Sequence, residues 1–567
     1  MRAKYSVFLI GLFSLFGPKI WGQTNVTEQV EVKREYKPIL GDSKKIRAQP
    51  YFFEATSKDI KQTYGFKDLL LKADTASNSI AIDSLKKNQE TNLFPFYFRV
   101  AAGNFQTLIG DFNFNSLPNP KLSYGLSIRH FGLKGKLQNQ EINTNRLSLF
   151  GKKIIENNYL SGELGLKLNS TPYYGYDNSL NNFSTSQVKQ NTQKFNLYLG
   201  FGKQLDTSSG VTYYARLGGY YLKDSHAETE GHTQFLGGLG FKNERFSFNL
   251  ATDYEGNKFT NPIQNFNTTL LRIAPYLTVN TDILKVKLGL NIVYEFGDRN
   301  QTYFFPDLSL NLQLIDGFDV FGGIKGDIIQ NSFQSLLNQN PYTLGVSGNQ
   351  LNSPVLEPQT GQKFNLQNSK ESILIFAGIK GNFSSEFNYR AQIDLAQWDR
   401  LPFFVNTYQT PDNFIVIYDG NRTLSTKIYG ELNYIFSDQV RLNTNLTINQ
   451  FKLTTLVKPW YNPNYQFEFL AHYNPTTDWL ITGSAFLVGR QFAQPKNIFN
   501  STVPSPATPP YNTIDSHLDL SLSLEYKVSK KIGVFIQGNN LLNHSYLQFI
   551  NYPVVGLNIL GGLSIRF

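Results

Sequence analysis

Apolar and polar residues alternate strictly along many segments of this 567-residue chain. A period of two predicts β-strands with one apolar and one polar face. The alternation runs for about eight to twelve residues, whereas half-buried strands of soluble sandwiches usually run for about five or six. Tilted strands of about nine to eleven residues are typical of transmembrane barrels. The pattern covers, among others, residues 163–169, 284–292, 308–314, 441–449 and 517–525.

A strand in hydrocarbon must pair every backbone N–H and C=O group, so an open sheet is excluded and the sheet must close. Alternating segments recur about every 21 residues across residues 94–567, which suggests about 22 strands. The even number follows if both ends of the barrel chain face the periplasm. The sequence therefore predicts an all-β protein, a transmembrane antiparallel β-barrel of about 22 strands.

Composition supports a chain with one face toward lipid and one toward water. Aromatic residues make up 14% and charged residues only 17%, below the roughly 25% charged of soluble domains. The aromatics suit girdles at the two membrane interfaces. Cysteine is absent, which excludes disulfides, thiol nucleophiles, cysteine-based zinc or iron–sulfur sites and a lipid-attachment cysteine. We expect no cofactor.

The first 93 residues differ from the rest. Residues 1–23 have the layout of a secretory signal peptide: Arg2 and Lys4, an apolar run too short to span a bilayer, then Gly22. Residues 24–93 are rich in charge and contain few large apolar residues. We therefore expect a charged periplasmic or lumenal extension with short helices near residues 66–72 and 80–87. No later stretch is apolar enough for a transmembrane helix.

Connections between the predicted strands alternate in length. Short turns are expected at residues 243–244, 316–317, 437–438 and 529–530, and we place them on the periplasmic side. Long polar stretches are expected to be extracellular loops. They cover residues 173–192, 331–370, 398–413 and 493–512.

The chain ends in an alternating segment that includes Leu563, Ile565 and Phe567. We expect a last strand whose apolar face meets lipid and which pairs with the first strand to close the cylinder. The terminal aromatic residue with this alternation resembles the signal that outer-membrane assembly machinery recognises. These three residues are therefore our candidates for barrel closure and assembly.

A second group of residues precedes this strand, namely Asn539, Asn540, Leu541, Asn543, Tyr546 and Gly556. Together with the closing strand, these residues resemble the last two strands of TonB-dependent receptors. The resemblance to that family covers residues 424–567, and over residues 93–423 it is one of architecture. The resemblance implies an integral outer-membrane barrel of a Gram-negative cell envelope that takes up solutes. It also implies outer-membrane lipids and the assembly machinery as partners.

Two departures from that family concern the coupling of transport. Val555-Gly556-Leu557 stands where the family has a Pro-Gly-Arg group, and residues 24–93 show no plug-like pattern. A 22-stranded barrel without a plug would leak, so we expect the extension, the loop 331–370 or a partner chain to fill the lumen. Coupling to TonB stays undecided, with residues 26–32 as the candidate contact strand.

Candidate catalytic residues are few. Asp515, Ser516 and His517 are contiguous, but neighbours on a strand point to opposite faces, so they form no triad. We therefore expect no enzyme activity. The aromatic residues Tyr173, Tyr174 and Tyr176 could stack on sugars, but membrane girdles are the simpler interpretation.

One segment carries potential metal ligands. In an extended conformation His226, Glu228, Glu230 and His232 would lie on one side and could hold a divalent cation. A solvated loop is the simpler interpretation, because metal sites need enforced geometry and a second shell of support. We expect no metal. Basic residues are spread along the chain without a cluster, which argues against a nucleic-acid partner.

Two functions remain open from the sequence. The first is a TonB-dependent receptor-like transporter or channel for solute uptake across the outer membrane. The second is a structural or accessory barrel whose charged extension binds other envelope proteins in an assembly or secretion complex. The resemblance favours transport, and the absent plug pattern keeps the second function open. The solute is not predicted.

Overall fold

The computed structural model describes residues 94–177, 182–203, 210–261, 265–297, 299–345, 366–384, 386–406, 412–493 and 511–567. The predicted signal peptide, the extension of residues 24–93 and its expected helices lie outside these ranges. Among the described residues, no helix is both long and apolar enough to cross a membrane.

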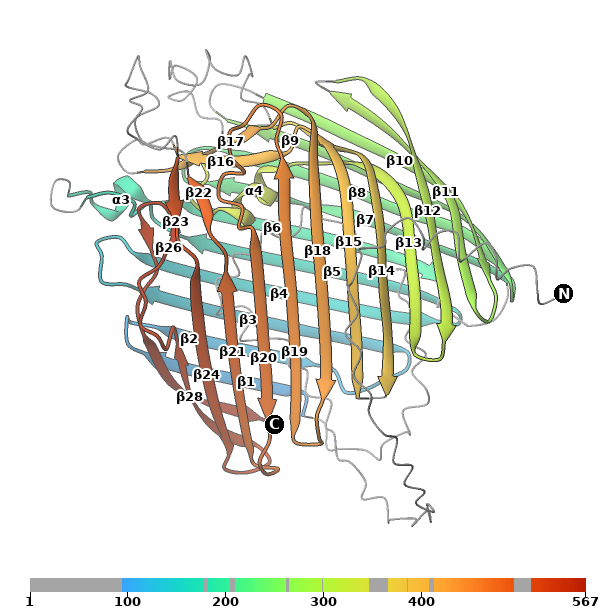
Figure 1. The fold of residues 1–567 in the computed structure, drawn as a ribbon. Helices are drawn as coiled ribbons and strands as arrows, with labels where there is room; N and C mark the ends of the chain where they lie inside the picture. Colours follow the sequence, from blue (N-terminus) through green and yellow to red (C-terminus); the bar gives the residue numbers. More distant parts are fainter. Residues whose placement is uncertain are drawn as a thin grey trace, which may run out of the picture. The chain divides into compact units, whose positions relative to one another are not determined.

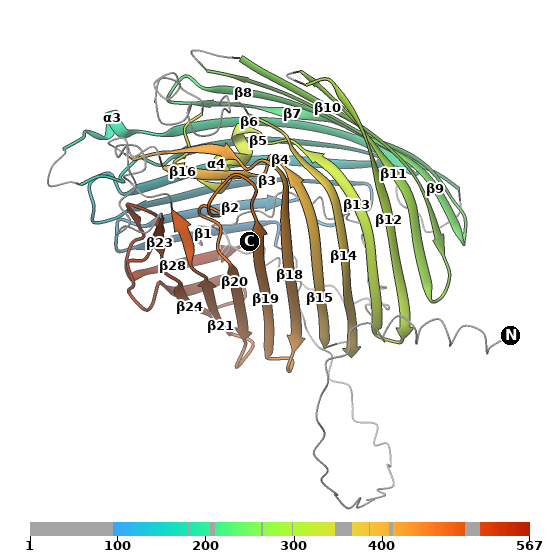
Figure 2. The ribbon, with the colours of Figure 1, turned by 45° about the horizontal axis from the view of Figure 1, so that its top comes forward.

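Twenty-two strands form one antiparallel sheet, which confirms the predicted all-β barrel and its strand number (Figures 1 and 2). In chain order they are β1 (Phe96–Gly103), β2 (Leu108–Asn115), β3 (Leu122–Lys134), β4 (Glu141–Ile155), β5 (Asn158–Ser170), β6 (Asn191–Lys203), β7 (Gly210–Asp224), β8 (Thr229–Lys242), β9 (Phe246–Thr260), β10 (Asn265–Asn280), β11 (Leu284–Gly297), β12 (Gln301–Ile315), β13 (Phe318–Ile329), β14 (Ser369–Ser384), β15 (Phe387–Asp399), β18 (Asn421–Ile435), β19 (Val440–Lys452), β20 (Tyr465–Tyr473), β21 (Trp479–Val488), β24 (His517–Lys527), β25 (Ile532–Asn539) and β28 (Asn558–Arg566).

The sheet closes between its first and last strands. Strand β1 pairs with β2 on one side and with β28 on the other, and Val100 lies opposite Leu563. The remaining neighbours along the barrel pair antiparallel in chain order, with the small strands of the long loops left out of the sheet. Closure leaves no free edge, so the backbone groups of every barrel strand have a partner strand on both sides.

Connections alternate between the two ends of the barrel. The turns predicted at residues 243–244, 316–317, 437–438 and 529–530 all lie between consecutive strands, at the end that also holds Phe567. We call this the turn end. The long connections lie at the opposite end, the loop end, as the figures show for β14, β15, β18 and β19 (Figure 2). The alternation of short turns and long loops is confirmed.

The outer face of the barrel is apolar. On β6, Phe195, Leu197, Leu199 and Phe201 are 43–53% exposed on one face, while polar residues alternate with them on the lumen side. A soluble protein rarely exposes so continuous an apolar surface. The pattern suits a band that meets lipid.

Aromatic side chains gather on this outer face near the turn end. Phe383 lies 4.8 Å from Tyr389 between ring centroids, and Phe387 lies 5.6 Å from Tyr434. At the seam of the barrel, Phe96 stacks on Phe567. Amphipathic and aromatic rings favour the membrane interface, so this belt has the composition of an interfacial girdle.

Neighbouring residues of β19 provide a direct test of the lipid-facing assignment. Leu446 is exposed on the outer face, whereas Asn445 faces inward and its amide donates to Glu468. We expect Leu446→Lys to lower the free energy of unfolding in lipid vesicles by about 2–4 kcal/mol, because a lysine in hydrocarbon is costly. Asn445→Lys should change it little, since the new charge faces the lumen beside a carboxylate. Urea unfolding of both variants is the measurement, and equal losses would contradict the assignment.

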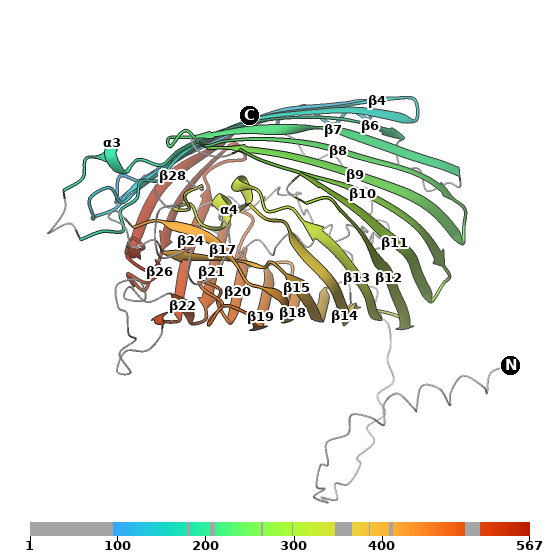
Figure 3. The ribbon, with the colours of Figure 1, turned by 90° about the horizontal axis from the view of Figure 1, so that it is seen from above.

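Helix α4 (Phe333–Gln339) and strand β17 (Phe414–Tyr418) of the long loops lie within the ring of strands at the loop end, whereas α3 (Thr185–Val188) lies outside it (Figure 3). We call the described residues of the long loops there, 171–177, 331–345, 400–406, 412–420, 453–464 and 540–557, the cap. The small elements of the loops are α3 (Thr185–Val188), α4 (Phe333–Gln339), β16 (Pro402–Asn406), β17 (Phe414–Tyr418), β22 (Gln491–Ala493), β23 (Asn512–Ile514), β26 (Leu547–Phe549) and β27 (Tyr552–Pro553).

Candidate functional site: the cap at the loop end

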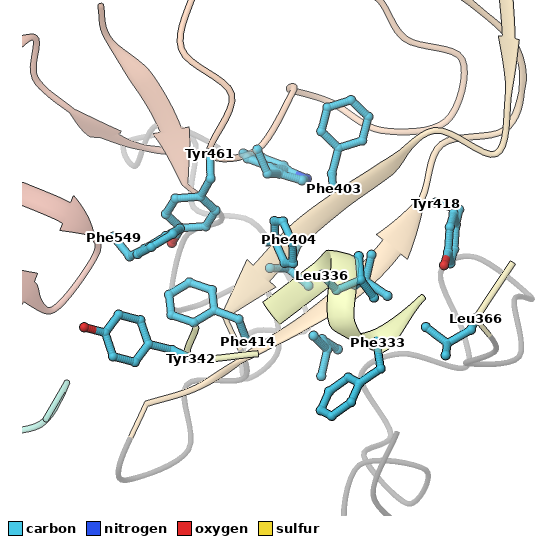
Figure 4. Packing of buried hydrophobic residues seen from close by; sticks show 14 of the residues in the cluster. Phe333, Leu336, Tyr342, Leu366, Phe403, Phe404, Phe414, Tyr418, Tyr461 and Phe549 are labelled. Carbon is cyan, nitrogen blue, oxygen red and sulfur yellow. The ribbon is translucent and has the colours of Figure 1, made fainter. Parts of the chain in front are cut away.

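The cap has an aromatic core to which separate loops contribute (Figure 4). Tyr342 stacks on Tyr552 with 3.9 Å between ring centroids. Phe414 contacts Tyr461 at 5.3 Å and Phe549 at 5.1 Å. These five side chains come from four different loops and are all buried. Burial of each contributes about 1.5–3 kcal/mol, so the four loops hold one another in place.

The same core continues onto the barrel wall. Phe333 of α4 lies 5.2 Å from Phe259 of β9, and Phe266 of β10 and Trp398 of β15 belong to the same buried cluster. The largest described apolar cluster of the protein therefore lies between the cap and the strands that surround it. The cap is packed against the wall in this structure and is not a set of independent loops.

Glu230, near the start of β8, anchors α4 to the wall. Its carboxylate is fully buried and accepts hydrogen bonds from the backbone N–H groups of Phe333 and Gln334 at 2.5 and 3.1 Å. The Tyr220 hydroxyl and the Asn257 amide donate to it from the neighbouring strands at 2.7 and 3.2 Å. One carboxylate thus joins β7, β8 and β9 to the first turn of α4.

Glu228 anchors the other end of the same loop segment. The backbone N–H of Gly345 donates to its Oε2 at 2.8 Å, and the side chain is fully buried. Burial, and then the neighbouring carboxylate of Asp224, raises the pKa of Glu228 well above its usual value. Residues 333–345 are therefore held between two buried glutamates that are two positions apart in the sequence.

Asp419, in the turn between β17 and β18, anchors another loop. Its carboxylate accepts from the backbone N–H groups of Thr454, Thr455 and Leu456 at 2.8–2.9 Å, and the Thr423 hydroxyl also donates to it. Burial by itself raises the pKa of Asp419, but these hydrogen bonds to the charged form outweigh burial and hold that pKa below its usual value.

The Asp419 anchor predicts a pH dependence of the cap. A carboxylate whose pKa is lowered in the folded state stabilises that state above its unfolded pKa of about 4, and this stabilisation is lost as pH falls through the lower folded value. We expect amide hydrogen exchange at Thr454–Leu456, corrected for its intrinsic pH dependence, to accelerate below about pH 4. In the variant Asp419→Asn, the amides of Thr454–Leu456 should exchange faster at neutral pH, and their exchange should no longer accelerate in acid. An acid dependence retained in this variant would contradict the assignment.

The structure corrects the solvated-loop interpretation of the segment from His226 to His232. Glu228 and Glu230 are buried and bind the backbone of the cap, while the His226 ring contacts Tyr173 and the His232 ring stacks on Tyr220. Among the described residues, no group of three or more histidine, cysteine, aspartate or glutamate side chains could hold a metal ion. Because they alternate along the chain, Glu228 and Glu230 point to the same side, and there they anchor the loop 331–345.

Tyr173 and Tyr174 also lie in the cap, so their assignment to a membrane girdle was wrong. Both are buried in the cluster between the cap and the wall. The ring of Tyr174 contacts Tyr552 at 4.8 Å, and its hydroxyl donates to the carbonyl of Pro553. Tyr176 packs at the edge of the cluster against Phe183. Local sequence did not distinguish girdle aromatics from loop-core aromatics.

The residues that resemble the receptor family shape the last loop. Asn540 and Asn543 adopt left-handed backbone angles, φ 48° and 51°, which asparagine tolerates better than most residues. The Asn540 amide donates to the carbonyls of His544 and Val555. Asn543 Oδ1 accepts from Leu557 N, and a Cβ on Gly556 would lie 2.4 Å from that oxygen. Both asparagines close the loop that carries Phe549 and Tyr552 into the cap.

The other members of that group lie nearby. Asn539 ends β25 and donates to Asn558 Oδ1 across to β28, and Leu541 is exposed. The Tyr546 hydroxyl donates to Asp519 Oδ2 at 2.9 Å, and its ring stacks on His517 at 3.8 Å. His517 is buried, while the Asp515 side chain is exposed, so the contiguous Asp515–His517 residues do not converge.

The candidate closure residues lie at the seam between β28 and β1. Leu563 is opposite Val100 and Ile565 is opposite Phe98 in the register of the two strands. Leu563 and Phe567 are exposed on the outer face. Their recognition by assembly machinery stays a prediction.

A buried ionic network that the sequence did not indicate lies in the wall next to the cap. Arg272 of β10 contacts Asp253 at 3.1 Å, Glu255 at 2.9 Å and Asp327 at 2.9 Å, and it donates to the carbonyl of Ile328. The four charged residues come from three different strands, separated by up to 74 residues in the chain, which is why sequence spacing did not reveal them.

No protein-family model and no curated protein sequence matches the chain. Solved structures of outer-membrane receptors do match its fold. The siderophore receptor PirA from Acinetobacter baumannii has a TM-score of 0.62 and 12% identity, over 83% of this chain and 80% of the receptor. The ferric-catecholate import receptor Fiu from E. coli K12 has a TM-score of 0.60 and 11% identity, over 84% and 82%.

A third similar structure is the pyoverdine outer-membrane receptor FpvA from Pseudomonas aeruginosa PAO1, bound to pyoverdine. Its TM-score is 0.59 with 11% identity, over 85% of this chain and 79% of the receptor. The chain therefore has the barrel fold of outer-membrane siderophore receptors, as its resemblance to TonB-dependent receptors predicted. At this identity the likeness concerns the fold. All three of these proteins are receptors.

Proposed function

We propose that this protein is an integral outer-membrane barrel for solute uptake, with the loop end outside the cell and the cap as the gate of the lumen. The observation that carries the proposal is the closed 22-stranded barrel, a size at which transporters hold a lumen wide enough to need a closure. The likeness to siderophore receptors supports uptake as the function.

The cap supports the role of a gate because it is attached at defined points. Glu228, Glu230 and Asp419 hold backbone segments of two loops by hydrogen bonds, and the aromatic core holds these and further loops to one another. A solute that offers competing hydrogen bonds and aromatic contacts could replace these contacts together and so shift the cap to an open state. Of the three candidates for filling the lumen, the described part of loop 331–370 lies in this cap. Whether a partner such as TonB drives the opening is part of the proposal that remains to be tested.

The alternative is a structural or accessory barrel that binds other envelope proteins. The packed aromatic core favours it, because a permanently closed loop end would suit a barrel that carries no solute. The two functions differ in one physical property: whether the lumen conducts once the cap is removed.

Single-channel conductance in planar bilayers separates them. We would compare the mature chain with a variant in which residues 333–344 are replaced by a short Gly-Ser linker, each with and without residues 24–93. Conductance in a version without residues 333–344 supports the gated barrel. Conductance that appears only when residues 24–93 are also absent would add the extension to the gate. Silence in all four proteins, each shown to be folded, would favour the accessory barrel. A Gly-Ser replacement of the turn at residues 528–531 controls for the linker.

A further inference from the structure

Four basic residues lie side by side on four consecutive strands, β3 to β6. In the strand register Arg129 is opposite Arg146, Arg146 is opposite Lys167, and Lys167 is opposite Lys194. We call these four residues the basic row. Because neighbouring strands lie about 4.8 Å apart, the row extends about 14 Å around the wall.

The row faces the lumen. Successive side chains of a strand point to opposite faces, and three sequence neighbours of the row are apolar and exposed on the outer face. Ile128 precedes Arg129, Leu168 follows Lys167 and Phe195 follows Lys194, and all three are exposed. Arg129 itself is paired at 2.9 Å with Asp111, which is buried on the inner side of β2.

The row concentrates positive charge on one part of the lumenal wall. Like charges directly opposite on neighbouring strands are destabilising, and the row places three such pairs in succession. Elsewhere on the wall basic residues have carboxylates beside them: Lys287 lies 2.7 Å from Asp307, and Arg272 is surrounded by three carboxylates. Lys380 lies opposite Arg390 on one side but opposite Asp319 on the other. The basic row has one carboxylate in its register, Asp111 at its end. Four adjacent basic residues in one register therefore distinguish this stretch of wall as a candidate site for anions.

Uncharged hydrogen-bonding residues flank the row on both sides. Toward the loop end, Thr144, Asn169 and Thr192 lie opposite one another in the next position of the register. Toward the turn end, Ser148 and Asn196 lie on either side of Gly165, at which a Cβ would lie 2.4 Å from Asn196 Oδ1. Hydroxyl and amide groups can donate hydrogen bonds beside the cationic groups.

The row also reaches the anchor of the cap. The Lys194 ammonium lies 4.8 Å from the centre of the Tyr220 ring, and the Tyr220 hydroxyl donates to Glu230, which holds α4. A solute that passes the cap beside α4 would therefore meet the basic row next.

We propose that the basic row is a lumenal binding site for solutes that carry two or more oxyanion groups, such as phosphates or carboxylates. Guanidinium and ammonium groups bind oxyanions by charge-assisted hydrogen bonds, and a row about 14 Å long can bind several such groups at once. The proposal deepens the uptake function by naming a solute class, and it rests on that function only for the claim that the solute crosses the membrane.

Equilibrium binding tests the site without requiring conduction. Inorganic tripolyphosphate is titrated calorimetrically into the full chain in detergent, at low and at high salt. The test variant is Arg146→Gln/Lys167→Gln. The matched control is Lys380→Gln/Lys427→Gln, which removes the same charge from the inner side of β14 and β18, where Lys380 lies opposite Arg390 and Lys427 opposite Asp394.

We expect tripolyphosphate to bind the wild type and the control, more weakly at high salt because the charges are screened, and to bind the test variant at least about tenfold more weakly. Absence of binding to the wild type, or equal binding to both variants, would overturn the proposal. If tripolyphosphate binds but the barrel does not conduct, the proposed binding site stands and the proposed uptake function is wrong.

Discussion

Arg272→Met is expected to lower the free energy of unfolding of the barrel by about 3–5 kcal/mol, because it removes the cation from a buried network and leaves its carboxylates uncompensated. Asp253 and Glu255 are largely buried beside it, and Asp327 is partly buried. Methionine has a similar length and removes little packing volume. The loss of stability therefore reports the charge and not a cavity. Urea unfolding in lipid vesicles, followed by tryptophan fluorescence, is the measurement.

Two further variants separate the ionic effect from a general loss of structure. Arg390→Met removes a cation from the same barrel, but Arg390 is exposed and donates to Gln392, so the change should cost less than about 1 kcal/mol. In the background of Arg272→Met, the changes Asp253→Asn and Glu255→Gln should restore part of the stability, because they remove the charges left unpaired. If neutralising both carboxylates restored nothing, the network would not be the source of the loss.

The strands were predictable from the sequence because their chemistry is local. In β11 every second residue from Leu284 to Ile292 is apolar, so the period of two and the length of the strand could be read directly. The turn between β12 and β13 was also predictable, since Gly317 adopts the left-handed backbone angle, φ 76°, that its Asp-Gly pair suggests. Closure then followed from the requirement to pair every strand.

The cap was not predictable, because each of its contacts joins residues far apart in the chain. Glu230 binds the backbone of Phe333, 103 positions later, and backbone acceptors and donors leave no pattern in a sequence. The only local signs were two short apolar runs: residues 403–405, within the stretch 398–413 taken as a polar loop, and residues 414–418 directly after it. These became β16 and β17 and supply part of the aromatic core.

The basic row shows how topology can gather residues that a sequence scatters. Arg129, Arg146, Lys167 and Lys194 are separated by 17, 21 and 27 positions, so the sequence predicted no cluster of basic residues. In an antiparallel barrel, two residues on neighbouring strands lie opposite each other when they are the same number of positions from the turn that joins the two strands. That register depends on strand boundaries, which a single sequence fixes only to within a few residues. The absence of a sequence cluster was therefore no evidence against a local concentration of charge.

Glu230→Ala is expected to detach α4 from the wall and to make the loop end of the barrel leaky. The change leaves two backbone N–H groups, the Tyr220 hydroxyl and the Asn257 amide without their shared acceptor. Hydrogen bonds to a charged group contribute about 1.5–3 kcal/mol each, so losing several should destabilise the closed position of α4 by a few kcal/mol or more. Contacts of Phe333 with Phe259 remain, and we expect them to be too weak to hold the helix by themselves.

Chymotrypsin cleavage after Phe333 or Leu336 measures this opening, because both side chains are buried in the wild type. We expect cleavage at least about tenfold faster in Glu230→Ala, since each 1.4 kcal/mol changes the open population tenfold when opening is fast relative to cleavage. Glu228→Ala removes the acceptor of Gly345 N and should give a smaller increase. Glu244→Ala, in an exposed turn at the other end, should give none. Wild-type cleavage in Glu230→Ala would mean that the aromatic core alone closes the barrel, and the search for a gate would then move from the carboxylates to Phe414 and its neighbours.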